Sequence, residues 1–215
     1  YTNLDWNLQK NVEENIQKSI PEDSEIQTSV VLMNPNTGGV LALAGGKDYN
    51  VSSFNRATDS SRQVGSTMKP YLYYAALENG FTSSSSFTSE ETTFVFNDQD
   101  DYTPQNYNQT YGNKPISMGT AIAYSENIYA VKTHLFLGSD ALINVARRVG
   151  ITAKLENVPS LPLGTNEINI LEMTAGYSSF ANLGYKVEPH FIEKVEDSNG
   201  KVLYEAKNKK EAVLN

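Results

Sequence analysis

Cysteine is absent from this 215-residue sequence, and histidine occurs only twice. The lack of cysteine excludes disulfide bridges and catalysis by a thiolate. Structural zinc sites are built mainly from cysteine and histidine. With His134 and His190 as the only histidines, we expect no structural zinc site, no other metal and no cofactor. Both histidines are expected to have structural roles.

Positive charge is also scarce, because 17 lysine and arginine residues stand against 25 aspartate and glutamate residues. The resulting net charge of -8 is the opposite of the basic surface that nucleic-acid binding requires, so nucleic acid is not an expected partner. Long apolar runs are missing too. None approaches the roughly 20 residues of a membrane-spanning helix.

The stretch at residues 62–70 reads Arg-Gln-Val-Gly-Ser-Thr-Met-Lys-Pro. In a helix, Ser66 and Lys69 would lie on one face, a single turn apart. A neutral amine beside a hydroxyl can accept its proton and so activate it as a nucleophile. Lys69 precedes a proline, which disfavours helical dihedral angles. We still expect a helix through Lys69 to Gly80, since local rules tend to break at functional sites.

The same spacing occurs a second time, in Ser198-Asn199-Gly200-Lys201. This second pair lies between two strand-like runs, and its asparagine and glycine favour a hairpin turn. We interpret Ser198 as a solvated turn residue. The spacing alone is therefore not specific, and Ser66 is distinguished by its surroundings.

The remaining pattern predicts a mixture of helices and strands. Residues 4–20 form an amphipathic pattern, with Asn3 or Asp5 as the cap. The strands predicted at residues 27–33 and 39–46 are apolar over several consecutive positions, which indicates burial on both faces.

Polar loops without a catalytic or binding role are expected at residues 83–86 and 97–101, and a mobile tail is expected after residue 204. Further helices are expected at residues 119–124, 128–136, 139–149 and 168–182, and a late hairpin at 191–196 and 201–204.

Taken together, several stretches resemble the transpeptidase domain of class A penicillin-binding proteins. Residues 34–46 resemble its opening strands, and Phe54-Asn55-Arg56-Ala57 followed by residues 62–70 resembles its first motif with the lead-in. Ser125-Glu126-Asn127 matches its second motif, Ser-x-Asn. Leu163-Gly164-Thr165 and residues 181–184 and 189–200 match the parts that follow. The similarity covers most of residues 4–205.

This resemblance implies an α/β (α+β) fold of the serine β-lactamase and penicillin-binding-protein type. Such a fold has an antiparallel sheet flanked by helices, with a helical subdomain. The third motif of the family, Lys-Thr-Gly, is absent from the sequence. We therefore expect an incomplete sheet, with a leader helix and entry segment at residues 1–25 and the N-terminal portion of the domain at residues 26–215. A glycosyltransferase domain and a membrane anchor would precede Tyr1, and the missing part of the transpeptidase domain would follow Asn215. The location implied is the extracytoplasmic face of the bacterial membrane.

The resemblance also implies a reaction, a D,D-transpeptidation of peptidoglycan stem peptides that β-lactam antibiotics block. Ser66 would attack the carbonyl between two terminal D-alanines, with Lys69 as its base. For this the pKa of Lys69 must fall by roughly 3, through burial or neighbouring cations. The Ser66 backbone N–H would help to bind the oxyanion.

Two residues of the second motif receive roles in the same way. Ser125 would relay a proton to the leaving amine, and Asn127 would hold a substrate amide. The residues alone leave open that Ser125 caps a helix and that Asn127 caps a loop. Glu126, between them, is expected to point outward. A second Ser-x-Asn, Ser53-Phe54-Asn55, is interpreted as structural.

Two other functions remain open at this point. A serine β-lactamase would need a further base for deacylation, and the Glu-x-x-Leu-Asn segment that usually supplies it is absent. A non-catalytic penicillin sensor or scaffold would keep the fold and an acylatable serine without transferring the acyl group.

Overall fold

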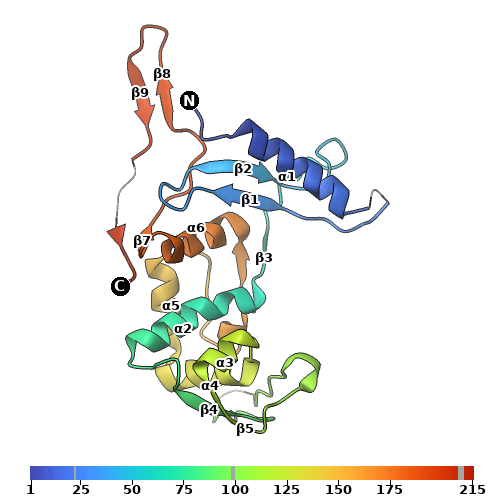
Figure 1. Ribbon diagram of the computed structural model, residues 1–215, viewed down its shortest axis with the longest axis vertical. Helices are drawn as coiled ribbons and strands as arrows, with labels where there is room; N and C mark the ends of the chain where they lie inside the picture. Colours follow the sequence, from blue (N-terminus) through green and yellow to red (C-terminus); the bar gives the residue numbers. More distant parts are fainter. Residues whose placement is uncertain (22, 98–99, 208–210) are drawn as a thin grey trace. The chain divides into compact units, whose positions relative to one another are not determined.

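The computed structural model describes residues 1–21, 23–97, 100–207 and 211–215 (Figure 1). The chain forms two compact units. The first contains Tyr1–Arg62, Arg147–Ala153 and Ile168–Asn215, and the second contains Gln63–Ala146 and Lys154–Glu167. Their boundaries fall within β3 (Ser61–Gln63), α5 (Ser139–Arg148) and β6 (Glu167–Asn169), and after Ala153.

The first unit begins with helix α1 (Trp6–Ser19), as the amphipathic pattern predicts. The side chain of Asp5 caps it by accepting hydrogen bonds from the N–H groups of Asn7 (2.9 Å) and Leu8 (3.0 Å). These two N–H groups would otherwise lack a partner in the first turn. Asp5, and not Asn3, is therefore the cap.

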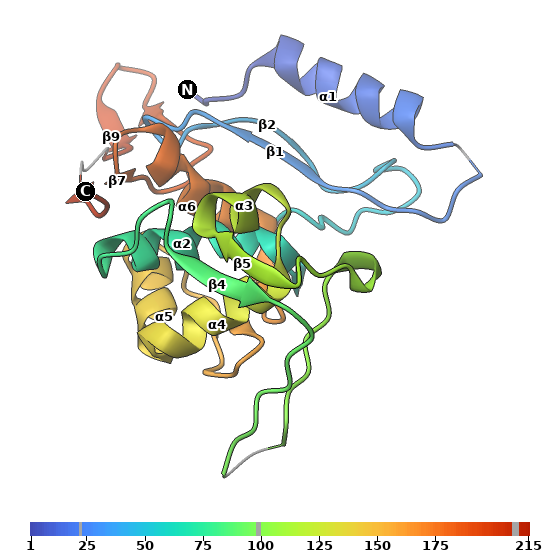
Figure 2. The same cartoon turned by 60° about the horizontal axis from the view of Figure 1, so that its bottom comes forward.

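Strands β1 (Val30–Met33) and β2 (Val40–Ala44) form an antiparallel hairpin between α1 and α6 (Ile170–Ala181), as both views show (Figures 1 and 2). The predicted burial on both faces is wrong in part. Only alternate residues of β2 are fully buried, namely Val40, Ala42 and Ala44, and Leu32 of β1 is 37% exposed. Two strands alone make a narrow layer, which the helices cover incompletely.

The two edges of this hairpin differ. Along β2, the carbonyl of Leu41 accepts a hydrogen bond from the Asp5 N–H (2.8 Å), and the side chain of Gln9 bonds both the carbonyl and the N–H of Leu43. Along β1, no backbone hydrogen bond from any described segment other than β2 is formed. The paired strands among the described residues all belong to two-stranded pairs, so the sheet is fragmentary, as expected.

The C-terminal part of the first unit contains two further strand pairs. In one, β8 (Lys194–Glu196) and β9 (Val202–Glu205) form the predicted late hairpin. Ser198 is exposed in its turn, where the Gly200 N–H bonds the Asp197 carbonyl (3.0 Å), so its interpretation as a turn residue is confirmed.

In the other pair, β7 (Tyr185–Lys186) joins β10 (Glu211–Ala212), so the predicted mobile tail is wrong for its last residues. Val213 and Leu214 are buried, and their N–H groups bond the Gly184 carbonyl (2.8 and 3.0 Å). Residues 208–210 of the predicted tail lie outside the described residues.

The second unit is mainly helical, with a core between α2 (Lys69–Glu78) and α4 (Asn127–Leu137). Its short elements are α3 (Met118–Ala123) and the 3₁₀ helices η1 (Gly65–Met68), η2 (Tyr107–Gln109) and η3 (Leu161–Leu163). The predicted helices in both units are confirmed to within a few residues at each end.

The second unit also contains an antiparallel pair, β4 (Ser86–Ser89) and β5 (Lys114–Ser117). Neither strand was predicted, and the loop predicted at residues 83–86 covers the first residue of β4. Its sequence, Ser-Phe-Thr-Ser, lacks the run of β-branched and aromatic residues that usually marks a strand. The loop predicted at residues 97–101 includes residues 98–99, which lie outside the described residues.

Candidate active site

A continuous helical segment carries Ser66 and Lys69. The 3₁₀ helix η1 runs directly into α2, and Lys69 itself has helical dihedral angles (φ -59°, ψ -36°). The predicted helix through Lys69 and Pro70 is thus confirmed. A proline is tolerated here because N–H groups in the first turn of a helix have no acceptor within the helix, so the missing N–H of proline costs no hydrogen bond. Residues three apart eclipse in a 3₁₀ helix, so Ser66 and Lys69 share one face.

The turn before Ser66 is fixed by two glycines. The N–H of Gly65 donates to the carbonyl of Gly164 (3.1 Å), and both residues have positive φ angles, +59° and +70°. A Cβ atom on Gly164 would overlap backbone atoms of Gly65. Only glycine permits so close an approach of the two chain segments.

The amine of Lys69 joins the two predicted motifs. Its Nζ donates hydrogen bonds to the Ser125 carbonyl (2.6 Å), to Ser125 Oγ (3.0 Å) and to Asn127 Oδ1 (2.6 Å). These three acceptors match the three N–H donors of an ammonium group. Because a hydroxyl both donates and accepts, a proton can pass between Ser125 and Lys69.

Burial changes the acidity of this amine. Lys69 is only 3% exposed. Burial lowers its pKa from 10.5 to about 8, against the opposing effect of the negative charge of Glu126. At pH 7 roughly one amine in ten is then neutral and able to accept a proton. Of the two causes considered from the sequence, burial is the one that lowers this pKa.

Ser66 lies at the exposed start of this helix. Among the described residues, no hydrogen bond joins Ser66 Oγ to Lys69 Nζ. Its backbone N–H lies in the first turn of η1, where N–H groups have no partner within the helix and the helix dipole is positive. The structure therefore brings Lys69, Ser125 and Asn127 into contact, with Ser66 one turn away on the same helix.

Ser125 has an unusual backbone. Its φ of +52° is in the left-handed region, which few residues other than glycine adopt. The Ser125 N–H bonds the Ile122 carbonyl (3.2 Å), and the Glu126 N–H bonds the Ala121 carbonyl (2.9 Å). This is the Schellman pattern that ends a helix, with serine in the place usually taken by glycine. Such strain in a non-glycine residue is typical of functional sites.

Asn127 uses both ends of its side chain. While Oδ1 accepts from Lys69, Nδ2 donates to the Gln105 carbonyl (2.7 Å). The cap of α4 is Glu126, whose carboxylate accepts a hydrogen bond from the Tyr129 N–H. Ser125 therefore does not cap that helix, whereas the bond from Asn127 to the Gln105 carbonyl is of the loop-capping kind that the sequence left open for Asn127.

The expectation that Glu126 points outward is wrong. Its side chain is buried (7% exposed), and it also accepts hydrogen bonds from Ser89 Oγ and Asn106 Nδ2, both at 2.6 Å. Ser89 and Asn106 were not predicted as site residues either. They belong to a strand and a loop in which the sequence shows no motif. Of the three residues, only Glu126 could have been singled out from the sequence, because it is a charged residue inside a motif.

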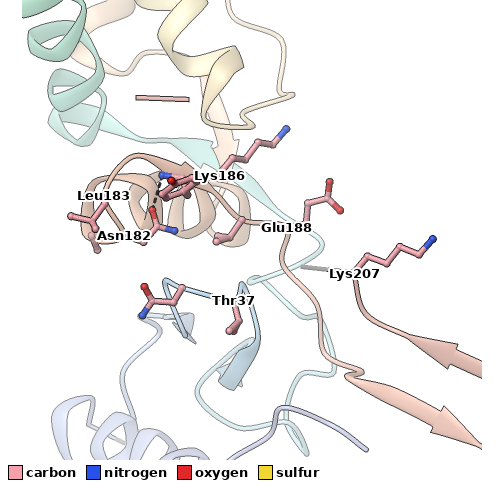
Figure 3. Close-up of a pocket in the computed structure, with 10 residues that line it drawn as sticks. Thr37, Asn182, Leu183, Lys186, Glu188 and Lys207 are labelled. Atoms are coloured by element: carbon pink, nitrogen blue, oxygen red, sulfur yellow. Dashed lines mark hydrogen bonds between the residues drawn. The ribbon is translucent and has the colours of Figure 1, made fainter. Parts of the chain in front are cut away.

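The other predicted features lie elsewhere. No cluster of three or more metal-binding side chains is found in the described part of the chain. Nor does any described helix combine the length and apolar character needed to cross a bilayer. A cavity of about 380 Å³ in the first unit is lined by residues 36–37, 181–183 and 185–188 and by Lys207 (Figure 3). It contains none of the four predicted site residues.

Comparison with known proteins gives consistent matches. A family model described as the penicillin binding protein transpeptidase domain matches residues 28–215. Penicillin-binding protein 2D of Bacillus subtilis is 47% identical over 215 residues, which are 100% of this chain and 31% of that protein. The chain thus spans about a third of the length of this relative.

Two solved structures have similar folds. Penicillin-binding protein 1A from Haemophilus influenzae gives a TM-score of 0.78 at 34% identity, over 86% of this chain and 28% of that one. The Mycobacterium tuberculosis PonA1 protein in complex with penicillin V gives 0.84 at 22% identity, over 100% of this chain and 59% of that one. At that identity, PonA1 supports the fold alone.

Proposed function

Because the chain belongs to the transpeptidase domain family of penicillin-binding proteins and has its serine β-lactamase-like fold, we propose that it supplies the acylation site of a D,D-transpeptidase. The observation that carries this proposal is the buried Lys69 amine bonded to Ser125 and Asn127. It joins the Ser-x-x-Lys and Ser-x-Asn motifs into one site beside Ser66.

The first half of the reaction acylates the serine. Ser66 Oγ attacks the carbonyl carbon between the terminal D-alanines of a stem peptide, and the neutral amine of Lys69 takes the hydroxyl proton. The Ser66 N–H stabilises the oxyanion. The C–N bond then breaks, and the leaving D-alanine receives a proton from Ser125, which is replenished by Lys69 across their hydrogen bond.

The second half transfers the acyl group. An acceptor amine attacks the ester carbon and loses a proton to the Ser125–Lys69 pair, and Ser66 regains its hydrogen as the ester bond breaks. Asn127 holds a substrate amide, for which it must exchange a hydrogen bond to Lys69 or to Gln105. A β-lactam would follow the first half alone, because its opened ring stays attached to the acyl group.

The relatives are longer than this chain, which supports a larger protein around the site. We place the site in a protein that also has a glycosyltransferase domain and a membrane anchor and works at the extracytoplasmic face of the bacterial membrane. The substrates are peptidoglycan stem peptides, and β-lactams are inhibitors.

The test uses a fluorescent penicillin on the full-length protein. Ser66→Ala should abolish labelling, whereas Ser198→Ala, at the other Ser-x-x-Lys, should leave it unchanged. Equal labelling of the Ser66 variant and the wild type would reject the nucleophile. A donor–acceptor cross-linking assay then separates a transpeptidase from a sensor, which would be acylated without transfer. Rapid turnover of penicillin would instead indicate a β-lactamase.

A further inference from the structure

A buried carboxylate lies directly behind the Ser125–Asn127 turn. Glu126 accepts hydrogen bonds from Ser89 Oγ on β4, from Asn106 Nδ2 on the loop after residue 100, and from the Tyr129 N–H in the first turn of α4. The Ser89 hydroxyl is free to donate because its oxygen accepts from the Gly112 N–H (2.9 Å). All three partners donate, which is the pattern that an ionised carboxylate satisfies.

Asn106 holds the same turn from its other end. Its Oδ1 accepts from the backbone N–H of Asn127 (2.8 Å) and of Ile128 (3.4 Å), while its Nδ2 bonds Glu126 and the Thr110 carbonyl (3.0 Å). One amide thus links the carboxylate to the backbone that follows it. The position of Ser125 and Asn127 depends on this pair of side chains.

The turn at residues 125–127 also fixes the position of the Lys69 amine. All three acceptors of Lys69 Nζ belong to residues 125 and 127, on either side of Glu126. A displaced Glu126 would displace these acceptors, and with them the Lys69 amine, which belongs to a residue one turn from Ser66. Its negative charge is also close enough to act on Lys69 electrostatically.

We propose that Glu126 is a positioning residue for Lys69, because its buried carboxylate holds the turn that supplies the amine's acceptors and places a negative charge near that amine. This inference rests on the proposed acyl transfer at Ser66. It assigns a role to the residue between Ser125 and Asn127, and Asn106 and Ser89 hold that residue in place by hydrogen bonds.

Few other ionisable groups face this pair. Burial raises the pKa of Tyr73 on α2 and of Tyr129 on α4, the latter to about 12, so both stay neutral near pH 8. Glu90, directly after β4, forms an ion pair with Lys132 of α4 (3.8 Å). Within the described residues, Glu126 is therefore the anion whose charge keeps Lys69 protonated to higher pH.

Two substitutions separate charge from position. Glu126→Gln keeps the length of the side chain and, through its oxygen, the bonds from Ser89 and Asn106, and it removes the charge. Only the bond from the Tyr129 N–H is lost, because an amide nitrogen cannot accept it. Glu126→Asp keeps the charge and loses the reach to Ser89 and Asn106. The measurement is the rate of acylation by a fluorescent penicillin in the full-length protein, followed from mildly acidic to mildly basic pH. Glu156→Gln, at an exposed ion pair with Lys154 (3.1 Å), is the matched control.

We expect acylation by the wild type to rise with pH, following the neutral amine of Lys69. In Glu126→Gln the midpoint of this rise should move down by about 1 pH unit, because the anion no longer favours the ammonium. In Glu126→Asp the midpoint should stay near that of the wild type, while the maximal rate falls by about 100-fold through misplacement. Glu156→Gln should change neither quantity.

Two results would overturn the inference. One is a Glu126→Gln profile with the wild-type midpoint, and the other is a Glu126→Asp variant with the wild-type maximal rate. If thermal unfolding shows that these variants do not fold, Ser89→Ala tests the same point by removing one donor. Its maximal rate should fall several-fold at an unchanged midpoint, and an unchanged rate would reject the positioning role. Failure of the proposed function is distinct, since labelling would then survive Ser66→Ala.

Discussion

Lys69 is the side chain on which the proposed acid–base chemistry depends most. Its pKa is lowered to about 8 by burial, so the neutral form becomes abundant as the pH rises through that value and is lost as the pH falls below it. Acylation should therefore increase about tenfold between pH 7 and pH 8.5 and level off above pH 9. Penicillin labelling rates across this range check the prediction, and a rate independent of pH would exclude Lys69 as the base.

Gly164, which contacts the turn before Ser66, the proposed nucleophile, offers a second test. Gly164→Ala should destabilise the protein by about 3 kcal/mol, since it adds an unfavourable left-handed alanine and an overlap with the Gly65 backbone. It should also slow acylation by shifting Ser66.

The control for this substitution is Gly80→Ala, at the end of α2. Gly80 also has a positive φ, +86°, but nothing lies within 4 Å of the added Cβ. We expect a loss of about 1 kcal/mol and normal labelling. Thermal unfolding of the two variants gives the comparison, and equal losses would show that the contact with Gly65 is unimportant.

Individual site residues differ in how well the sequence predicts them. The Ser66–Lys69 spacing is local, so a helix alone places both on one face. The environment of Glu126 depends on Ser89 and Asn106, which lie 37 and 20 residues away along the chain. No local pattern around Glu126 reports those contacts, which is why its predicted exposure was wrong.

Among the helices, the junction between α3 and α4 carries the clearest strain. Ser125 occupies the left-handed position of a Schellman turn, where glycine would relax the backbone. Ser125→Gly should therefore stabilise the protein by about 1 kcal/mol and, by removing the hydroxyl, strongly slow acyl transfer.

Ser125→Ala is the comparison for this prediction, because it removes the hydroxyl and keeps the strained backbone. Denaturation curves should rank the glycine variant as the most stable of the three proteins, with both variants poor in the cross-linking assay. A glycine variant less stable than the alanine variant would contradict the role of strain.

Helices were predictable here because their signals are local. Asp5 begins α1 as a cap, and the apolar spacing of residues 4–20 fixes its length. Strand β4 was not predictable from the sequence, because Ser-Phe-Thr-Ser becomes a strand only through its pairing with β5. The order of residues 211–214 likewise follows from contacts with β7 and Gly184, which no local pattern in the tail indicates.

For the chain as a whole, the open edge of β1 is the feature that most favours self-association. The β2 edge is occupied by Asp5 and Gln9, but β1 offers its outer backbone groups to any other strand. The 215-residue chain should therefore self-associate as its concentration rises. Leu32→Lys, which adds a charge to this strand, should reduce association in sedimentation experiments, and an unchanged self-association would locate the contact elsewhere.

The same 215 residues should also acylate slowly by themselves. The sequence has no Lys-Thr-Gly motif, and by the family resemblance the second oxyanion donor belongs to the strand that carries it. Losing one such donor typically costs about 100- to 1000-fold in rate. Labelling of the 215-residue chain and of the full-length protein gives the ratio, and equal rates would show that the site is already complete.

The contact between Gly65 and Gly164 also sets an order of events during synthesis. Roughly a hundred residues separate these two glycines, and a ribosome adds about 5–20 residues each second. About 5–20 s therefore pass between the synthesis of Gly65, next to Ser66, and the synthesis of Gly164, which binds it. A nascent chain interrupted in that interval contains Ser66, the proposed nucleophile, but not yet the Gly164 segment that holds the turn before it.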